Sequence, residues 1–229
     1  MGRILEPSGA VAGTLLPAPR VRVPSKPRPE APGTSRLAQI RSVGCHLLLE
    51  HGYAGMTMRQ IAARLRIKAA SLYYHFPSKQ EILFDLMRAT ASELLAGLRS
   101  IAESDEEPDE QLDAAIRWHV LFHTQKREEA FVSHSELRSL EPENLKAILK
   151  LRREYERLFD AILKRGQREG VFAIEDVSVV RNCILTMCTA TAGWFSPQGR
   201  LSAEQVADQI RRFVRAALVK RNGAQALVT

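Results

Sequence analysis

Apolar side chains recur along most of the chain at the three- and four-residue spacing of an amphipathic helix. The first such run begins behind a candidate N-cap at Thr34 or Ser35 and ends near Gly52. Beyond an acidic break over 103–110, the same spacing predicts helices over about 111–124, 126–138, 142–169, 176–195 and 203–220. No run alternates with the period of two that marks a strand, and no repeat period is visible. The pattern therefore predicts an all-α fold.

Two short helices separated by a tight turn follow the first helix. Thr57 caps a run over 58–65, and after the turn a second run covers about 68–75. Ser78 then caps a long helix. Two short helices joined this closely have the proportions of a helix-turn-helix, which places its second helix in the major groove of DNA. With the first helix they predict a three-helix DNA-binding domain over 34–80.

Positive charge is concentrated in the first third of the chain. The whole chain carries a formal net charge of +7, of which residues 1–33 contribute +3 and residues 34–80 contribute +6, leaving −2 for the rest. A basic segment ahead of a near-neutral body is typical of a polyanion-binding module, although a basic solvated surface has the same composition. Residues 1–33 also hold seven of the eleven prolines, which predicts a disordered, Pro-rich basic tail.

Composition predicts a soluble protein of the cytoplasm that needs no cofactor. Hydrophobic residues make up 45% of the chain and charged residues 26%. The longest apolar run, over 184–195, is shorter than the roughly 20 residues that cross a bilayer, and we see no signal-peptide pattern. Cys45, Cys183 and Cys188 lie in apolar helical stretches without metal-binding spacing, so we expect small buried side chains in a reducing compartment.

The helix predicted over 68–75 carries more aromatic surface than it can bury. Leu72 and Phe76 are four residues apart and are expected to face inward. Three consecutive side chains, Tyr73, Tyr74 and His75, point in three directions, whereas only one face of a helix can pack against a small domain. The side chains left to meet DNA are Lys68, Ala69, Ser71, Tyr73, Tyr74 and His75, with Thr57 and Arg59 from the preceding helix and Lys79 from the next.

These residues belong to a longer distinctive string: Gly52-Tyr53, then Thr57-Met58-Arg59-Gln60-Ile61-Ala62, then Ser71-Leu72-Tyr73-Tyr74-His75-Phe76 and Ser78-Lys79. The string resembles the DNA-binding domain of the TetR family of bacterial transcriptional regulators, and the similarity covers 34–87 without a gap. The resemblance implies that Tyr73, Tyr74 and His75 contact the DNA backbone and base methyls. It further implies that Ser71 and Arg59 read bases and that Thr57 and Lys79 hold phosphates.

Arg66 departs from this resemblance, because family members usually have glycine there. If the turn needs a positive φ at this position, arginine is unfavourable by on the order of 1 kcal/mol. Contact between its guanidinium and a DNA phosphate could compensate.

Four segments of the second half resemble one branch of the family: HVLFH at 119–123, ELRSL-x-PE at 136–143, G-x-R-E-G-VF at 166–172 and GWFSP-x-G at 193–199. Members of that branch often control lipid, steroid or aromatic-acid breakdown and respond to acyl-CoA thioesters. The resemblance thus implies a ligand-binding and dimerisation domain over 81–222 and a repressor that its effector releases from DNA. The candidate ligand contacts are His119, Phe122, His123, Arg138, Trp194 and Phe195, with Arg152, Arg153 and Arg181 as further candidates for phosphates.

The last two predicted helices supply a candidate homodimer face. Paired across a twofold axis they would form a four-helix bundle and set two recognition helices about 34–36 Å apart, as a palindromic operator requires. The apolar positions of these helices are Val179, Val180, Cys183, Ile184, Met187, Val206, Ile210, Phe213, Val214 and Ala217.

Several alternatives remain open at the level of sequence. His119 and His123 share a helix face at a spacing that can bind zinc, but no third ligand is evident, and two packing histidines explain the pair without a metal. Trp194 and Phe195 could be core or dimer contacts. The effector could be a hydrophobic drug or antibiotic, and the chain could be a nonspecific architectural DNA-binding protein. The sequence contains no Gly-rich phosphate loop, nucleophile elbow or metal-hydrolase motif, so we expect no enzyme.

Overall fold

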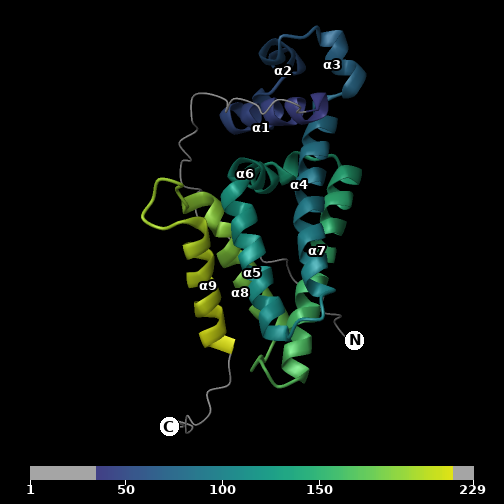
Figure 1. The fold of residues 1–229 in the computed structure, drawn as a ribbon. Coiled ribbons are helices and arrows are strands. Elements are labelled where there is room, and N and C mark those ends of the chain that lie inside the picture. Colours follow the sequence, from purple (N-terminus) through teal and green to yellow (C-terminus); the bar gives the residue numbers. More distant parts are fainter. Residues whose placement is uncertain (1–34, 219–229) are drawn as a thin grey trace, which may run out of the picture.

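The computed structural model describes residues 35–218, which form helices joined by loops (Figure 1). The elements are α1 (Arg36–Gly55), α2 (Met58–Leu65), α3 (Ala69–His75), α4 (Lys79–Ala102), α5 (Pro108–Gln125), α6 (Arg127–Ser135), the 3-10 turn η1 (Leu137–Ser139), α7 (Pro142–Arg168), α8 (Val177–Trp194) and α9 (Ala203–Leu218). The predicted all-α class is confirmed. The tail predicted over 1–33 lies outside the described residues. No helix within 35–218 is both long and apolar enough to cross a membrane.

Side-chain caps set the starts of α1, α2 and α4 at the predicted positions. Ser35 and Ser78 each accept a hydrogen bond through Oγ from the N–H three residues further on, at 3.3 and 3.2 Å. Thr57 and Gln60 form a full capping box, in which each side chain accepts from the backbone N–H of the other. These contacts are local in sequence, which is why the pattern of residues could predict them.

Two predicted boundaries in the second half are wrong. The acidic break is shorter than 103–110, because α5 begins at Pro108. Proline suits the first helical position, where its fixed φ fits and no N–H is needed. The helix predicted over 126–138 is divided, since α6 ends at Ser135 and the chain then tightens into η1.

Two apolar cores lie along the molecule, and α4 contributes to both. Leu83 and Leu86, near its start, pack with α1, α2 and α3, whereas Leu95 and Leu98, near its end, pack with the helices of the body. In Figure 1, α2 and α3 lie at one end, and α4 runs from there alongside α7. The first core also includes Val132, Leu140 and Ile148, which come from α6, the segment after η1, and α7. Packing is therefore continuous across the predicted boundary at 80/81, and α4 joins the two regions directly.

Candidate DNA-binding surface and ligand cavity

Helix α3 buries one side and exposes the other. Leu72 is fully buried and Phe76 is 6% exposed, and both pack in the first core, as expected. Tyr73 is 51% exposed and Tyr74 is 87% exposed. The ring of His75 is half-buried and meets the ring of Tyr74 edge-on at 5.4 Å. The remaining predicted contacts of this helix, Lys68, Ala69 and Ser71, are exposed. The structure thus brings the predicted α3 residues together on one surface, and their contact with DNA stays a prediction.

The three predicted DNA contacts outside α3 differ in whether their side chains already make hydrogen bonds within the protein. Arg59 is exposed on α2. The hydroxyl of Thr57 serves the capping box, since it accepts from the N–H of Gln60 and donates to Gln60 Oε1 at 2.7 Å. Lys79 Nζ donates to the carbonyl oxygens of Tyr53 and Met56 at 2.8 and 3.3 Å. Thr57 and Lys79 therefore already have structural partners, and a phosphate contact would have to be made in addition.

The turn between α2 and α3 has the positive φ at Arg66 that the sequence analysis considered. Arg66 has φ 53° and ψ 42°, in the left-handed region, and no other non-glycine residue of the described chain has a positive φ. Its N–H donates to the carbonyl of Ala63, and the N–H of Ile67 donates to that of Ala62, which closes α2. The exposed Arg66 side chain stands beside the recognition surface.

A cavity of about 600 Å³ lies in the body, lined by five helices and open to solvent on one side. Its volume is within the range of small-molecule sites, roughly 300–1,000 Å³. The wall is mainly apolar, and three of its residues come from α4, the helix that begins beside α3. The lining includes Met87, Ala91 and Leu94 of α4, His119 and His123 of α5, Ser133 and His134 of α6, Leu151, Arg152, Tyr155 and Glu156 of α7, and Leu185 and Thr189 of α8.

The two predicted histidines line this cavity but play different parts. His119 is 4% exposed, and its two ring nitrogens lie 2.8 Å from the Tyr155 hydroxyl and 2.9 Å from Thr189 Oγ1. Burial lowers the pKa of His119 well below its usual value, so the ring is neutral. The ring of His123 stacks on that of His119 at 4.2 Å with 2° between the planes. Within residues 35–218, no group of three side chains has the arrangement of a metal site.

Four of the predicted ligand contacts, Phe122, Arg138, Trp194 and Phe195, do not line this cavity. Phe122 packs on another side of α5, against Trp118 and beneath the ammonium of Lys126. The remaining three are Arg138, exposed on η1, Trp194, 57% exposed at the end of α8, and Phe195, buried in the body core. Their aromatic or basic character suggested ligand contact, whereas the direction of each side chain depends on tertiary packing.

The basic residues considered for phosphates separate in the same way. Arg152 lines the cavity and donates to the carbonyl oxygen of Ser133 at 2.7 Å. Arg181 instead makes two 2.9 Å hydrogen bonds to Asp160, and Arg153 is exposed on α7 away from the cavity lining. Sequence reasoning missed Tyr155 and Thr189, because nothing in their local sequence indicates that α7 and α8 meet α5 at the same point.

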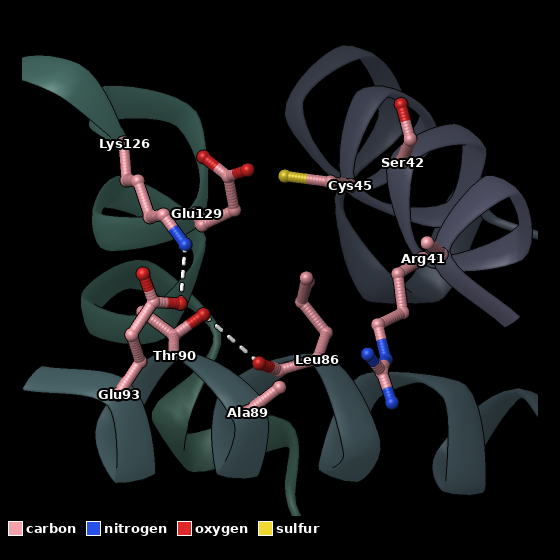
Figure 2. Close-up of a pocket in the computed structure, with 10 residues that line it drawn as sticks. Arg41, Ser42, Cys45, Leu86, Ala89, Thr90, Glu93, Lys126 and Glu129 are labelled. Atoms are coloured by element: carbon pink, nitrogen blue, oxygen red, sulfur yellow. Dashed lines mark hydrogen bonds and ion pairs between the residues drawn. The ribbon is translucent and has the colours of Figure 1, made fainter. Parts of the chain in front are cut away.

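A smaller hollow of about 220 Å³ lies where α1 meets α4 and α6 (Figure 2). Lys126 forms an ion pair with Glu93 on one side, and the Cys45 thiol points toward Glu129 across it. Burial, with the nearby Glu129 carboxylate, raises the pKa of the thiol well above its usual value, so Cys45 is protonated. Two contacts bridge the same helices: His46 Nδ1 lies 3.0 Å from a Glu128 carboxylate oxygen, and Arg41 forms an ion pair with Asp85 at 2.5 Å. Charged and polar side chains therefore line the contact of α1 with α4 and α6.

The outer face of α8 and α9 exposes large apolar side chains. Val179 is 57% exposed, Trp194 57% and Phe213 65%, and Cys183 lies on the same face of α8 as Val179. Other predicted dimer positions, Ile184, Val206, Ile210 and Val214, are buried in the protomer's own core. Helices α8 and α9 therefore expose only part of the predicted set of apolar side chains, and dimerisation through them stays a prediction.

Comparisons with known proteins match both regions. Residues 40–86 match the family model described as bacterial regulatory proteins, tetR family, and residues 105–218 match a tetracyclin repressor-like C-terminal domain. The HTH-type transcriptional repressor KstR2 of Mycobacterium tuberculosis is 27% identical over 188 residues, which cover 81% of this chain and 94% of that protein. These matches are to transcriptional regulators rather than enzymes.

Two solved structures are similar in sequence and in fold. The structure of KstR2 of Mycobacterium tuberculosis has a TM-score of 0.76 at 26% identity, covering 82% of this chain and 97% of that one. The structure of AibR in complex with isovaleryl coenzyme A and operator DNA has a TM-score of 0.71 at 27% identity, covering 78% of this chain and 97% of that one.

Proposed function

The chain belongs to the TetR family of bacterial transcriptional regulators, and on this premise we propose that it is a repressor that binds a palindromic operator as a homodimer and is released by an acyl-CoA thioester. The observation that carries the proposal is the connection between an exposed aromatic helix and an internal cavity. The helix that begins beside α3, α4, also supplies Met87, Ala91 and Leu94 to the cavity wall.

Operator contact is assigned to the surface of α3. Tyr73 and Tyr74 expose rings that can pack on sugars and thymine methyls, while Ser71 and Arg59 offer hydrogen bonds to base edges. Lys68 and Arg66 supply exposed positive charge for phosphates. We assign residues 34–80 to this DNA-binding domain and 81–222 to the effector-binding and dimerisation domain, with α4 crossing between them.

Homodimer formation is assigned to the outer face of α8 and α9. Trp194, Val179 and Phe213 would lose their exposure to water in a four-helix bundle with a second copy. A dimer is also what two half-sites one DNA turn apart require.

The effector class is supported by the cavity and by a relative. The mainly apolar wall suits an acyl chain or ring, and Arg152 is the basic side chain that lines it. AibR, whose structure is similar, is seen with isovaleryl coenzyme A and operator DNA. We therefore place the acyl part in the cavity and the coenzyme part toward its opening.

Release follows from a two-state equilibrium. An effector that binds better when α4 is displaced shifts the dimer toward a state whose recognition helices are wrongly spaced for adjacent grooves. The shift can be no larger than the effector's difference in affinity for the two states.

Filling the cavity tests the proposal. We expect Ala91→Phe to block calorimetric binding of acyl-CoA esters while operator binding survives, because the added ring occupies the space of the acyl part. The matched control is Ala96→Phe, on the exposed side of the same helix, which should bind esters as the wild type does. Equal binding of esters and unacylated coenzyme A to all three proteins would refute placement of the acyl part in the cavity.

A further inference from the structure

The cavity contains a hydrogen-bond acceptor whose protonation state the structure defines. His123 Nδ1 lies 2.9 Å from the carbonyl oxygen of His119. A carbonyl oxygen only accepts, so Nδ1 carries the hydrogen. Burial lowers the pKa of His123 to about 4, and the ring is therefore neutral at pH 7. The lone pair of a neutral ring with a hydrogen on Nδ1 is on Nε2.

This acceptor is without a partner in the part of the chain that the structure describes. The stacked ring of His119 uses both nitrogens, with Tyr155 and Thr189, whereas His123 makes a hydrogen bond only through Nδ1. His123 is 4% exposed and lines the cavity. The stack on His119 and the hydrogen bond from Nδ1 together fix the orientation of the ring. Nε2 therefore cannot rotate away from the cavity unless that hydrogen bond breaks. Nε2 faces the cavity and is not among the atoms that are buried without a partner, so a donor that enters the cavity can reach it.

Other polar groups of the same wall do not satisfy it. Ser133 Oγ, which also lines the cavity, is buried without a hydrogen-bond partner in the described chain. Arg152 donates to the Ser133 carbonyl, and the Glu156 carboxylate lines the same wall and acts electrostatically on the guanidinium. His134 lies on α6 with its ring centroid 6.4 Å from that of His123. The wall therefore presents Nε2 of His123 as a fixed acceptor. Ser133, His134 and Arg152 are among the groups able to donate beside it, Glu156 adds a carboxylate, and most of the remaining surface is apolar.

We infer that the effector carries a hydroxyl group on the part enclosed by the cavity, and that this hydroxyl donates to His123 Nε2. The inference rests on the proposed function only in taking the cavity as the effector site. It narrows the effector class, because an unsubstituted hydrocarbon leaves Nε2 unpaired, and an oxo group would place a second acceptor against it. Ser133 or Arg152 can donate to the hydroxyl oxygen.

The test uses two probes of nearly the same shape, phenol and toluene, which differ by a hydroxyl in place of a methyl. Their binding is followed by ¹⁵N NMR of the histidine rings and by calorimetry on the full chain. Phenol should shift the Nε2 resonance of His123, and toluene should leave it nearly unchanged. In the variant His123→Phe, which keeps an aromatic ring on His119, we expect the phenol-to-toluene affinity ratio to fall by roughly five- to a hundredfold.

Two further variants make the test specific. His123→Gln keeps an acceptor and should recover part of the preference for phenol. His51→Phe, at an exposed position on α1, should leave it unchanged. An unshifted Nε2 resonance at saturating phenol, failure of both probes to bind, or the same affinity ratio in wild type and His123→Phe would overturn the inference. None of these results depends on acyl-CoA or operator DNA, so the proposed function stands or fails separately.

Discussion

The ammonium of Lys79 lies 4.3 Å above the ring of Tyr53 and donates to the carbonyl oxygen of the same residue at 2.8 Å. It thereby ties the start of α4 to the end of α1, where carbonyl groups carry the negative end of the helix dipole. A residue expected to hold a DNA phosphate is thus a structural element of the DNA-binding domain.

Replacing two lysines separates the structural role from DNA contact. Lys79→Met should lower the free energy of unfolding by about 1–3 kcal/mol, because two carbonyl groups lose a charged donor. Lys68→Met should leave stability unchanged, since that exposed side chain makes no hydrogen bond in the described chain. It should instead weaken operator binding and reduce the salt dependence by about one ion. Urea denaturation measures the stability of each variant, and operator affinity at several salt concentrations measures DNA contact. Equal stability of Lys79→Met and wild type would contradict the structural role of Lys79.

Arg66 should trade stability for DNA contact. Arg66→Gly is expected to raise the free energy of unfolding by up to about 1 kcal/mol, because glycine adopts a φ of 53° without a Cβ clash. Operator affinity should fall, since the exposed guanidinium is lost. Urea denaturation and a DNA-binding titration on the same protein measure the two effects. If the variant gained operator affinity, a phosphate role for Arg66 would be ruled out.

Local features of the fold follow from sequence, whereas the cavity does not. Thr57 and Ser78 could be placed because a cap and its N–H lie three residues apart. Leu72 and Phe76 could be oriented because one short helix has one buried side. His119 and His123 are four residues apart and share one face of α5. A cavity that is lined by one of them is therefore also lined by the other.

The remaining cavity residues depend on how separate helices cross. Tyr155 and Thr189 meet His119 although 36 and 70 residues separate them from it in sequence. Trp194 was a reasonable candidate by residue type, but it lies where α8 ends and faces outward. Side-chain chemistry alone cannot distinguish a cavity wall from an outer face on the same helix.

Stability should depend on pH through His123. Its pKa is about 4 in the folded protein, against about 6.5 in an unfolded chain. Below pH 6.5 the unfolded state takes up a proton that the folded ring does not. The stability contribution is therefore complete above pH 6.5 and is lost as the pH falls toward 4, by up to about 3 kcal/mol.

Urea denaturation at several pH values between 7 and 4 measures this effect in wild type and in His123→Phe. The difference between the two unfolding free energies should change over this interval, because His123 is the titrating side chain that the variant lacks. Parallel profiles would show that His123 does not titrate with a depressed pKa.

Breaking the outer face of α8 and α9 should separate the dimer. Phe213→Glu places a charge at a side chain that is 65% exposed in one protomer and enclosed in the proposed bundle. Sedimentation should report a monomer, and operator affinity should fall by roughly a hundredfold or more as the second half-site contact becomes independent. Ala114→Glu, exposed on α5, is the control and should remain dimeric. A Phe213→Glu protein that remains a dimer would place the interface elsewhere.

Selection of bound duplexes from a random DNA pool, with and without a panel of acyl-CoA esters, tests the central claim most directly. The account predicts an enriched near-palindrome that the wild type binds, that Tyr74→Ala binds far more weakly at unchanged stability, and that one or more esters release. Enrichment that no ester disturbs would contradict the proposed effector class. A pool in which no sequence is enriched would contradict specific repression and favour a nonspecific DNA-binding protein.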